Sequence, residues 1–408
     1  MLRNVGCIVL AFAAVVAGGS LLVSAASPRT EAANKALDYV RTLQNADGGF
    51  PDYSGATIDA VFAFAAAGID ARTVKKDGSS PLDYLKATGA SYSDAPGGAA
   101  KLVLALAAMK EDPRSFAGTD FLAKMESKFD SASHSNGDHT LYMLARSSLG
   151  LSPAPGSVEH LKSKQTGDGC WEWSDGAGCD TNTTALAIEA LLAAGVDPSD
   201  SAVEDALDYL EDAQNDDGGF PYDPLSSWGT DSDANSTAFV IQALVAAGED
   251  VDEDGRWQAP DGTTPLKALL RFQNPQTGAF TYSGKDDAYA TYQSIPALLL
   301  EPYPGAPKTQ EREATRTPKP TKTPTPTVAP TAEPTATPLP PSAAPTLVAP
   351  PLSTAPTSAV AGITVVAAGE GATSGEDSTT TRILMTLLLA GGGALTAAGG
   401  VIIGARRR

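Results

Sequence analysis

Two kinds of hydrophobic pattern alternate along residues 30–301. Segments such as "VEDALDYLEDAQ", residues 203–214, place apolar side chains at helical spacing on one face and acids on the other. Segments such as "STAFVIQALVAAG", residues 236–248, are apolar on nearly every side and end in glycine, a common helix stop. The first kind predicts helices with one face in water, and the second kind predicts buried helices.

The two kinds of helix follow each other six times, and four of these pairs share a connecting string of Gln, a turn, Gly and an aromatic residue. The Gln and aromatic positions are Gln44 and Phe50, Gln165 and Trp171, Gln214 and Phe220, and Gln273 and Phe280. We interpret the glycines as the chain reversal, the aromatic as a plug between adjacent pairs, and the Gln as a partner for backbone at a helix end. Six pairs without a polar capping repeat predict two concentric, closed rings of helices.

The string Gln-x(3 or 4)-Gly-x-Phe/Trp resembles the QW repeat of squalene–hopene cyclases. Together with the helix pairs, residues 30–301 resemble the prenyltransferase and squalene-cyclase repeat superfamily. This resemblance implies an all-α fold, the α6/α6 toroid. The same toroid serves lipid-modifying enzymes, thioester domains and cobalamin carriers, so the resemblance constrains the fold more tightly than the function.

The N-terminal residues have the pattern of an export signal. Arg3 precedes an apolar run from Val5 to Val23 and then small residues. This pattern predicts a secretory signal over residues 1–26, cut after Ala25 or Ala26, with an uncleaved anchor as the alternative.

The C-terminal part predicts a membrane anchor on a stalk. Residues 383–405 carry no charge, are long enough to span a bilayer as a helix, and precede three arginines that should stay in the cytoplasm. We therefore expect a transmembrane helix with a basic tail in residues 382–408. Residues 302–381 are rich in Pro and Thr and predict a disordered stalk. Residues 27–301 would then be the globular domain, exported and held outside the cell membrane.

The charge of this domain limits its possible binding partners, and its two cysteines predict a disulfide. Residues 27–301 carry 42 acidic and 19 basic side chains, which excludes nucleic acid as a natural partner. Cys170 and Cys179 lie nine positions apart in an exported protein, so we expect a disulfide between them.

Polar and aromatic residues recur where the buried helices begin. Each buried helix enters from the same kind of turn, so the six should run parallel, with their N-termini at one rim. The residues expected at this rim are Asp59, Asp138, Asp180, Asn182, Asn235, Asp287, Tyr289 and Tyr292. The acids and amides could cap helices, or they could line the mouth of a central cavity, and both roles can hold at once.

The resemblance also points to a catalytic motif that is incomplete here. Squalene-type cyclases protonate an alkene with an Asp-x-Asp-Asp motif, and the nearest string, residues 231–234, lacks the last Asp. Asp231 and Asp233 are therefore the candidate catalytic residues of a terpenoid-cyclase-like enzyme. Protein prenyltransferases bind zinc through Asp, Cys and His, but Thr237 and Ala290 stand near the Cys and His positions, so no zinc is expected.

Two other sets of possible metal ligands lead to different expectations. The string "DVDEDGRWQAPD" places four acids at EF-type positions 1, 3, 5 and 12 and predicts a Ca²⁺ site, unless Arg256 simply neutralises the acids. These acids are Asp250, Asp252, Asp254 and Asp261. The three histidines, at 134, 139 and 160, have no spacing typical of a metal site, and we expect surface or turn positions for them.

These features favour a binding function over catalysis. The leading interpretation is a membrane-anchored extracellular toroid that binds a small apolar or corrinoid-like ligand, or a surface partner. The alternative is a terpenoid-cyclase or prenyltransferase-like enzyme that uses a rim aspartate. A third class, a purely structural surface protein, is favoured if side chains fill the central cavity.

Overall fold

The computed structural model describes residues 27–129, 134–227, 229–252 and 255–308. These residues belong to one compact unit of the chain, and a second unit, residues 316–383, lies outside them. The predicted signal peptide and transmembrane helix, and the stalk after residue 308, also lie outside the described residues. Among the helices that are described, none combines the length and apolar character needed to cross a membrane.

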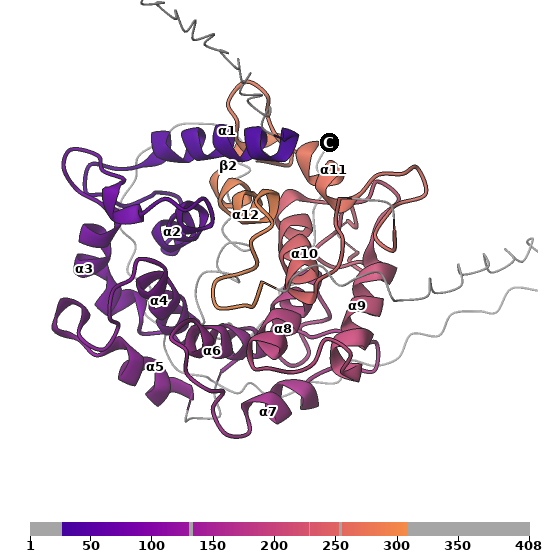
Figure 1. The fold of residues 1–408 in the computed structure, drawn as a ribbon, viewed down its shortest axis with the longest axis horizontal. Helices are drawn as coiled ribbons and strands as arrows, with labels where there is room; N and C mark the ends of the chain where they lie inside the picture. The colour runs from indigo at the N-terminus through magenta and orange to yellow at the C-terminus, as the bar shows by residue number, and fades with distance from the viewer. Residues whose placement is uncertain (1–26, 130–133, 228, 253–254, 309–408) are drawn as a thin grey trace, which may run out of the picture. The chain divides into compact units, whose positions relative to one another are not determined.

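The helices of the described residues form two concentric rings (Figure 1). The outer ring consists of α1 (Pro28–Leu43), α3 (Pro81–Tyr92), α5 (Phe121–Phe129), α7 (Ser157–Ser163), α9 (Ser201–Ala213) and α11 (Pro265–Leu270). The inner ring consists of α2 (Ala56–Ala66), α4 (Pro96–Ala108), α6 (Asn136–Ser148), α8 (Thr181–Ala193), α10 (Ala234–Ala247) and α12 (Ala288–Leu298). The expected α/α toroid of six helix pairs is therefore confirmed.

Short elements fill some of the connections between the helices. The 3₁₀ turns η1 (Ala71–Thr73) and η2 (Phe116–Gly118) follow α2 and α4. The strands β1 (Phe280–Tyr282) and β2 (Lys285–Asp287) pair antiparallel, with Phe280 opposite Asp287, and lead directly into α12.

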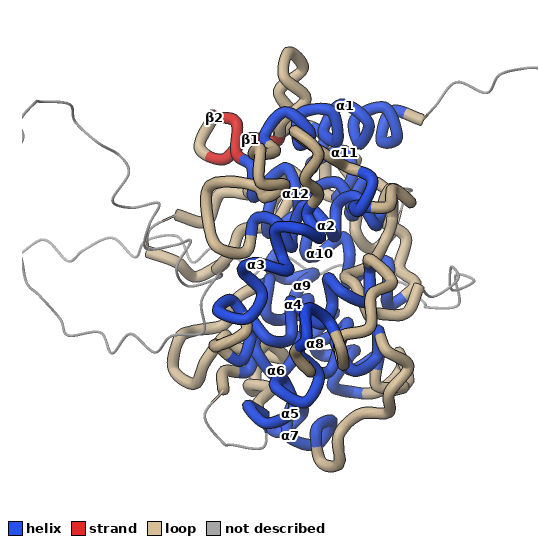
Figure 2. Tube along the Cα trace, turned by 90° about the vertical axis from the view of Figure 1, so that its left-hand side faces the viewer, coloured by secondary structure: helices blue, strands red, loops and turns tan. Residues whose placement is uncertain are grey.

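The ring closes where the last pair meets the first. Helix α12 packs against both α10 and α2, and α1 packs against α11 and α12. Two hydrogen bonds cross this seam: Arg29 Nη1 donates to Leu298 O at 3.1 Å, and Gln273 Nε2 donates to Ala32 O at 2.8 Å. In the side view, α1, α11 and α12 accordingly lie together (Figure 2).

The two hydrophobic patterns match the two rings. In α9 the buried side chains are those of residues 202, 203, 206, 207, 210 and 213, a single stripe that faces inward. In α8 every residue from Thr181 to Leu192 is buried. The inner helices α6 and α10 cover it on two sides, and the outer helices α7 and α9 cover it from outside. A helix apolar on all sides is stable only in such a covered position.

The repeated Gln links four of the six helix pairs to the next pair. Gln214 Nε2 donates to Gly218 O in its own turn at 3.0 Å and to Trp257 O before the next outer helix at 2.9 Å. Gln165 makes the same two bonds to Gly169 O and Ala202 O, at 2.8 and 2.9 Å. Gln44 and Gln273 repeat the pattern. The Gln amide bonds backbone carbonyls as predicted, but these lie in its own turn and either before or in the first turn of the next outer helix.

The glycine and the aromatic of the string are fixed by close contacts. Gly218 has φ +81°, and a Cβ there would lie 2.8 Å from Thr263 O, so both its conformation and the space available favour glycine. Phe220 is fully buried, and its N–H donates to Thr237 Oγ1 at 3.0 Å. The equivalent bonds go to Thr57, Thr184 and Thr291. This role of the four threonines was not predicted.

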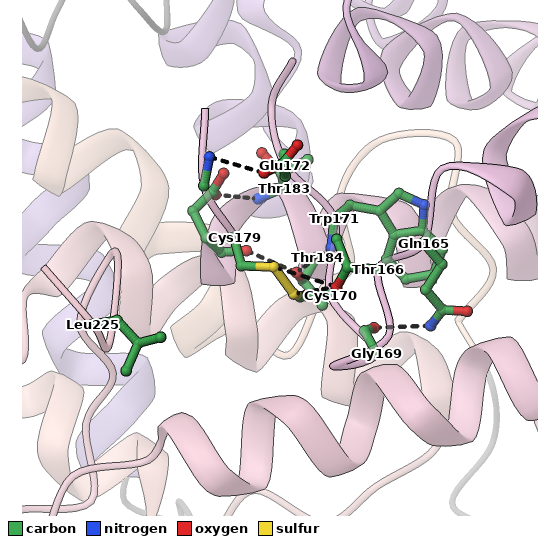
Figure 3. The surroundings of a disulfide bond; sticks show 12 residues. Gln165, Thr166, Gly169, Cys170, Trp171, Glu172, Cys179, Thr183, Thr184 and Leu225 are labelled. Atoms are coloured by element: carbon green, nitrogen blue, oxygen red, sulfur yellow. Dashed lines mark hydrogen bonds between the residues drawn. A yellow bond between two sulfur atoms is a disulfide. The ribbon is translucent and has the colours of Figure 1, made fainter. Parts of the chain in front are cut away.

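The expected disulfide is present between Cys170 and Cys179, whose Cα atoms are 5.8 Å apart (Figure 3). The loop that it closes is also held by Glu172, whose carboxylate accepts from Gly176 N at 2.6 Å and from Gly178 N at 3.1 Å. This loop leads into the N-terminus of α8, so the disulfide fixes part of the rim.

Residues after α12 cross the inner ring instead of leaving it (Figure 1). Tyr303 is 4% exposed, and its ring lies 5.5 Å from that of Phe62 and 6.1 Å from that of Phe239. Its N–H donates to Glu189 Oε1 at 2.8 Å. The globular part therefore extends beyond Glu301, the predicted end of the domain. Pro302 and Pro304 match the composition of the predicted stalk, yet they flank a residue that is part of the core.

The Gln linkage predicts a stability effect at Gln214. Gln214→Ala leaves the carbonyls of Gly218 and Trp257 without their side-chain donor, so we expect a loss of about 1–3 kcal/mol in the free energy of unfolding. Urea unfolding of the full-length chain measures it. Gln276→Ala, at an exposed turn position, is the control and should change stability by less than about 0.5 kcal/mol. Equal effects of the two substitutions would refute the linkage.

Glu189 predicts a pH dependence of stability. Burial raises the pKa of its carboxyl from 4.5 to about 8. Between these two values the folded state holds a proton that the unfolded state has lost, so stability falls as the pH rises through this window. Thermal midpoints should therefore decrease from pH 5 to pH 8, and Glu189→Gln should flatten the decrease. A variant with the wild-type slope would show that Glu189 does not cause it.

Candidate functional site

The N-terminal ends of the inner helices meet at one rim, as the topology predicts. Thr181 Oγ1 at the start of α8 donates to Pro221 O, in the segment before α10, at 2.8 Å. The ring of Tyr53, before α2, meets the ring of Tyr289 in α12 edge to face at 5.5 Å. We call these N-terminal ends and the loops that enter them the rim.

Most of the rim acids act as helix caps. Asp180 Oδ1 accepts from Thr183 N at 2.7 Å, and Asp233 Oδ1 accepts from Ser236 N at 2.9 Å. Asp287 caps α12 in the same way, through Ala290 N at 2.9 Å. Asp138 forms a capping box with Ser135. The capping interpretation therefore describes these four acids.

Asp59 differs from the other rim acids because it forms a buried ion pair. Its Oδ1 lies 2.7 Å from Lys101 Nζ of α4, and its Oδ2 accepts from Tyr53 OH at 2.8 Å. The side chains of Asp59 and Lys101 are 0% and 10% exposed. Lys101 is the one charged residue within the apolar string of α4, which is the signal that could have identified it. A buried pair of this kind is held only where both charges keep their partners.

Several buried polar atoms at the rim have no hydrogen-bond partner among the described residues. They include Tyr92 OH, Tyr292 OH and Asn235 Oδ1. A buried polar atom left unpaired costs about 1–3 kcal/mol, so such atoms call for a bound molecule or water. Tyr289 and Tyr292 lie in the first turns of α12, Asn235 lies in the first turn of α10, and Asn182 is buried beside Thr181 at the start of α8.

The two candidate catalytic acids differ in their surroundings. Asp231 is exposed in the loop before α10. Burial raises the pKa of Asp233, but its carboxylate is held by Ser236 N at 2.9 Å and by Ser236 Oγ at 2.8 Å. Burial also raises the pKa of Asp180, to about 7, so part of this carboxyl is protonated at neutral pH.

The predicted calcium loop is only partly within the described residues, because Asp254 lies outside them. Asp250 Oδ1 accepts from Asp252 N at 2.9 Å, and Asp261 Oδ1 accepts from Thr263 N at 2.8 Å. Arg256 reaches α9, where it pairs with Asp208 at 2.6 Å and with Glu211 at 2.7 Å. Calcium binding stays a prediction.

The three histidines, in contrast to the expectation from their spacing, lie together. His134 Nε2 is 3.0 Å from His139 Nδ1, and one potential ligand atom from each of the three side chains lies within 4.8 Å of the other two. Burial lowers the pKa of His139 from 6.5 to about 4, and it also lowers the pKa of His160. The loop before α6 and the packing of α7 on α6 bring them together. We call them the histidine cluster.

Comparisons with known proteins agree with the fold. Residues 116–274 match the family model "Squalene-hopene cyclase C-terminal domain". The sequence matches none of the curated proteins with which it was compared.

Three solved structures illustrate what the chain resembles. The type II terpene cyclase from Scytonema, in its apo form, aligns with 67% of this chain and 97% of its own, at 14% identity and a TM-score of 0.45. The ent-copalyl diphosphate synthase from Streptomyces platensis aligns with 60% of this chain and 50% of its own, at 18% identity and a TM-score of 0.42. Haptocorrin in complex with Cbi aligns with 70% of each chain, at 13% identity and a TM-score of 0.45.

The family match covers the middle of the toroid, from α5 to α11, and the four Gln-linked turns extend the same repeat around the ring. Residues 27–308 form an α/α toroid whose middle part, residues 116–274, resembles the squalene-hopene cyclase C-terminal domain.

Proposed function

We propose that the protein is an exported, membrane-anchored binding module that holds a small ligand at the rim of its toroid. The predicted helix in residues 382–408 would anchor it, and the predicted stalk would hold the toroid outside the cell. The observation that carries the proposal is the set of buried rim atoms without a hydrogen-bond partner among the described residues, Tyr92 OH, Tyr292 OH and Asn235 Oδ1.

The occupied interior argues against a cyclase of the usual kind. An enzyme that cyclises a long polyene needs an apolar hollow that can enclose it. Here the segment around Tyr303 crosses the inner ring, and a Cβ on Gly305 would lie 2.2 Å from Leu144 O of α6. The ion pair of Asp59 and Lys101 adds charge where a hydrocarbon would need apolar contacts.

The rim supports ligand binding over a purely structural role. Tyr92 OH, Tyr292 OH and Asn235 Oδ1 are buried atoms from three helices that lack partners among the described residues. A ligand with amide donors and acceptors would satisfy them. Of the two predicted ligand classes, an amide-rich corrinoid-like molecule fits these atoms better than a hydrocarbon.

A terpenoid-cyclase-like enzyme is the second candidate, and one observation favours it. Asp180 is buried at the rim, and its raised pKa of about 7 keeps a fraction of the carboxyl protonated at neutral pH. It would replace Asp231 and Asp233 as the proton donor.

Hydroxyl deletions at the rim test the binding proposal. The full-length chain should bind a corrinoid in isothermal titration calorimetry, because the ligand amides complete the unpaired hydroxyls. Tyr92→Phe and Tyr292→Phe keep the rings and should each weaken binding about 2- to 10-fold. Tyr84→Phe, on the outer helix α3, is the control and should leave affinity unchanged. Absence of corrinoid binding, or equal affinities in all variants, would count against the proposal.

Turnover assays distinguish the enzyme from the binding module. We expect no cyclised product when the full-length chain is incubated with squalene-like or geranylgeranyl substrates, since the interior is occupied. Product detected by mass spectrometry, and abolished by Asp180→Asn or Asp233→Asn, would replace the binding proposal with catalysis. Asp216→Asn, at an exposed turn position, is the matched control.

A further inference from the structure

The histidine cluster lies between an inner helix and its outer partner. His139 belongs to the first turns of α6, His160 belongs to α7, and His134 lies in the loop just before α6. His139 is 6% exposed, and the other two are partly exposed, so the cluster opens to solvent on one side.

The orientation of His139 leaves one ring nitrogen for a ligand role. Its Nε2 lies 3.1 Å from Ser157 O and 2.9 Å from Ser157 Oγ. A carbonyl oxygen can only accept, so this contact favours the proton on Nε2 and a lone pair on Nδ1. Metal-binding histidines commonly donate their second N–H to a backbone carbonyl in this way, which fixes the ring and its tautomer.

The distances in the cluster fit a small tetrahedral ion. In a zinc site with Zn–N bonds of about 2.0–2.1 Å, two ligand nitrogens are about 3.3 Å apart. His134 Nε2 and His139 Nδ1 are 3.0 Å apart in a hydrogen bond, which a bound ion between the two nitrogens would replace. The cluster's three ligand atoms lie within 4.8 Å of one another, so a side-chain rotation of His160 would complete the geometry.

We propose that His134, His139 and His160 form a binding site for a divalent transition-metal ion, with Zn²⁺ as its occupant. Three imidazoles suit zinc and copper and not calcium or magnesium, which prefer oxygen ligands. The fourth position faces the open side of the cluster and takes water or an added ligand. The site differs from the zinc site of prenyltransferases, whose positions carry Thr237 and Ala290 here.

The bound ion would brace a weak part of the outer ring. Helix α7 spans seven residues, which is too short to be stable on its own. A metal shared by α6, α7 and the loop before α6 cross-links three segments at once. Its binding energy then adds to the stability of the folded state, because the unfolded chain does not hold the three ligands together.

Titration with Zn²⁺ alone tests the site. The full-length chain is purified without a polyhistidine tag, stripped with a chelator, and titrated with ZnCl₂ in a calorimeter. We expect saturable binding of a single ion per chain and a rise in Tm. His160→Gln and His134→Gln, at partly exposed positions, should each weaken binding at least about 10-fold and remove the rise in Tm. Co²⁺ in place of Zn²⁺ should give the visible bands of a tetrahedral site.

Two controls make the outcome decisive. Glu159→Gln removes an exposed potential ligand from the same helix as His160, and it should leave zinc affinity unchanged. Circular dichroism confirms that each variant is folded. No saturable Zn²⁺ binding in the wild-type chain, or a folded His160→Gln variant that binds as tightly as the wild type, would overturn the proposal.

Discussion

The side-chain amide of the repeated glutamine joins four of the six helix pairs to the next pair and helps to close the ring. Each pair of helices has an inner helix that is apolar on all sides, so no pair can be stable alone. The glutamine joins the turn of one pair to the backbone before or within the next outer helix, as Gln165 does with Gly169 O and Ala202 O. At the seam, Gln273 makes the same bond to Ala32 O of α1 and converts a stack of pairs into a ring. Closure removes the two exposed ends that an open array would have to cap.

Closure of the ring also determines where the helix N-termini and the acidic side chains lie. Because each inner helix enters from an equivalent turn, all six N-termini face the same way, and their unpaired N–H groups and positive dipole ends gather at the rim. Acids such as Asp180 and Asp233 are placed there to satisfy these groups. Helix α4 begins with "PGGAA" and has no capping acid. Beside it, Asp59 forms its ion pair with Lys101 of α4. The rim acids are therefore explained first by helix termination.

The sequence predicted the features that local spacing encodes and missed those that depend on packing or on loops of variable length. Helical periodicity, the Gln strings and the cysteine spacing were enough for the toroid, its closure, the parallel inner helices and the disulfide. The histidine cluster was missed because His160 meets His139 only through the packing of α7 on α6, which spacing along the chain does not encode. Tyr303 was assigned to the stalk because its neighbours are prolines, yet burial of its ring against Phe62 and Phe239 outweighs that local signal. Thr237 and its equivalents were missed because loop lengths vary between each aromatic and its threonine.

The rim acids cap helices and are also the candidate proton donors, and the first role affects the second. A carboxylate that caps a helix is favoured in its ionised form by the N–H groups that it accepts, whereas burial favours the protonated form. At Asp180 burial dominates and the pKa reaches about 7, although Thr183 N–H opposes it. Loss of the proton to a substrate carbon would leave the carboxylate that Thr183 N–H favours, so the cap itself does not oppose this step. The inner ring would, however, have to release Tyr303, whose N–H is held by Glu189. This requirement acts against turnover of a substrate inside the ring, in line with the ligand-binding function proposed for the rim.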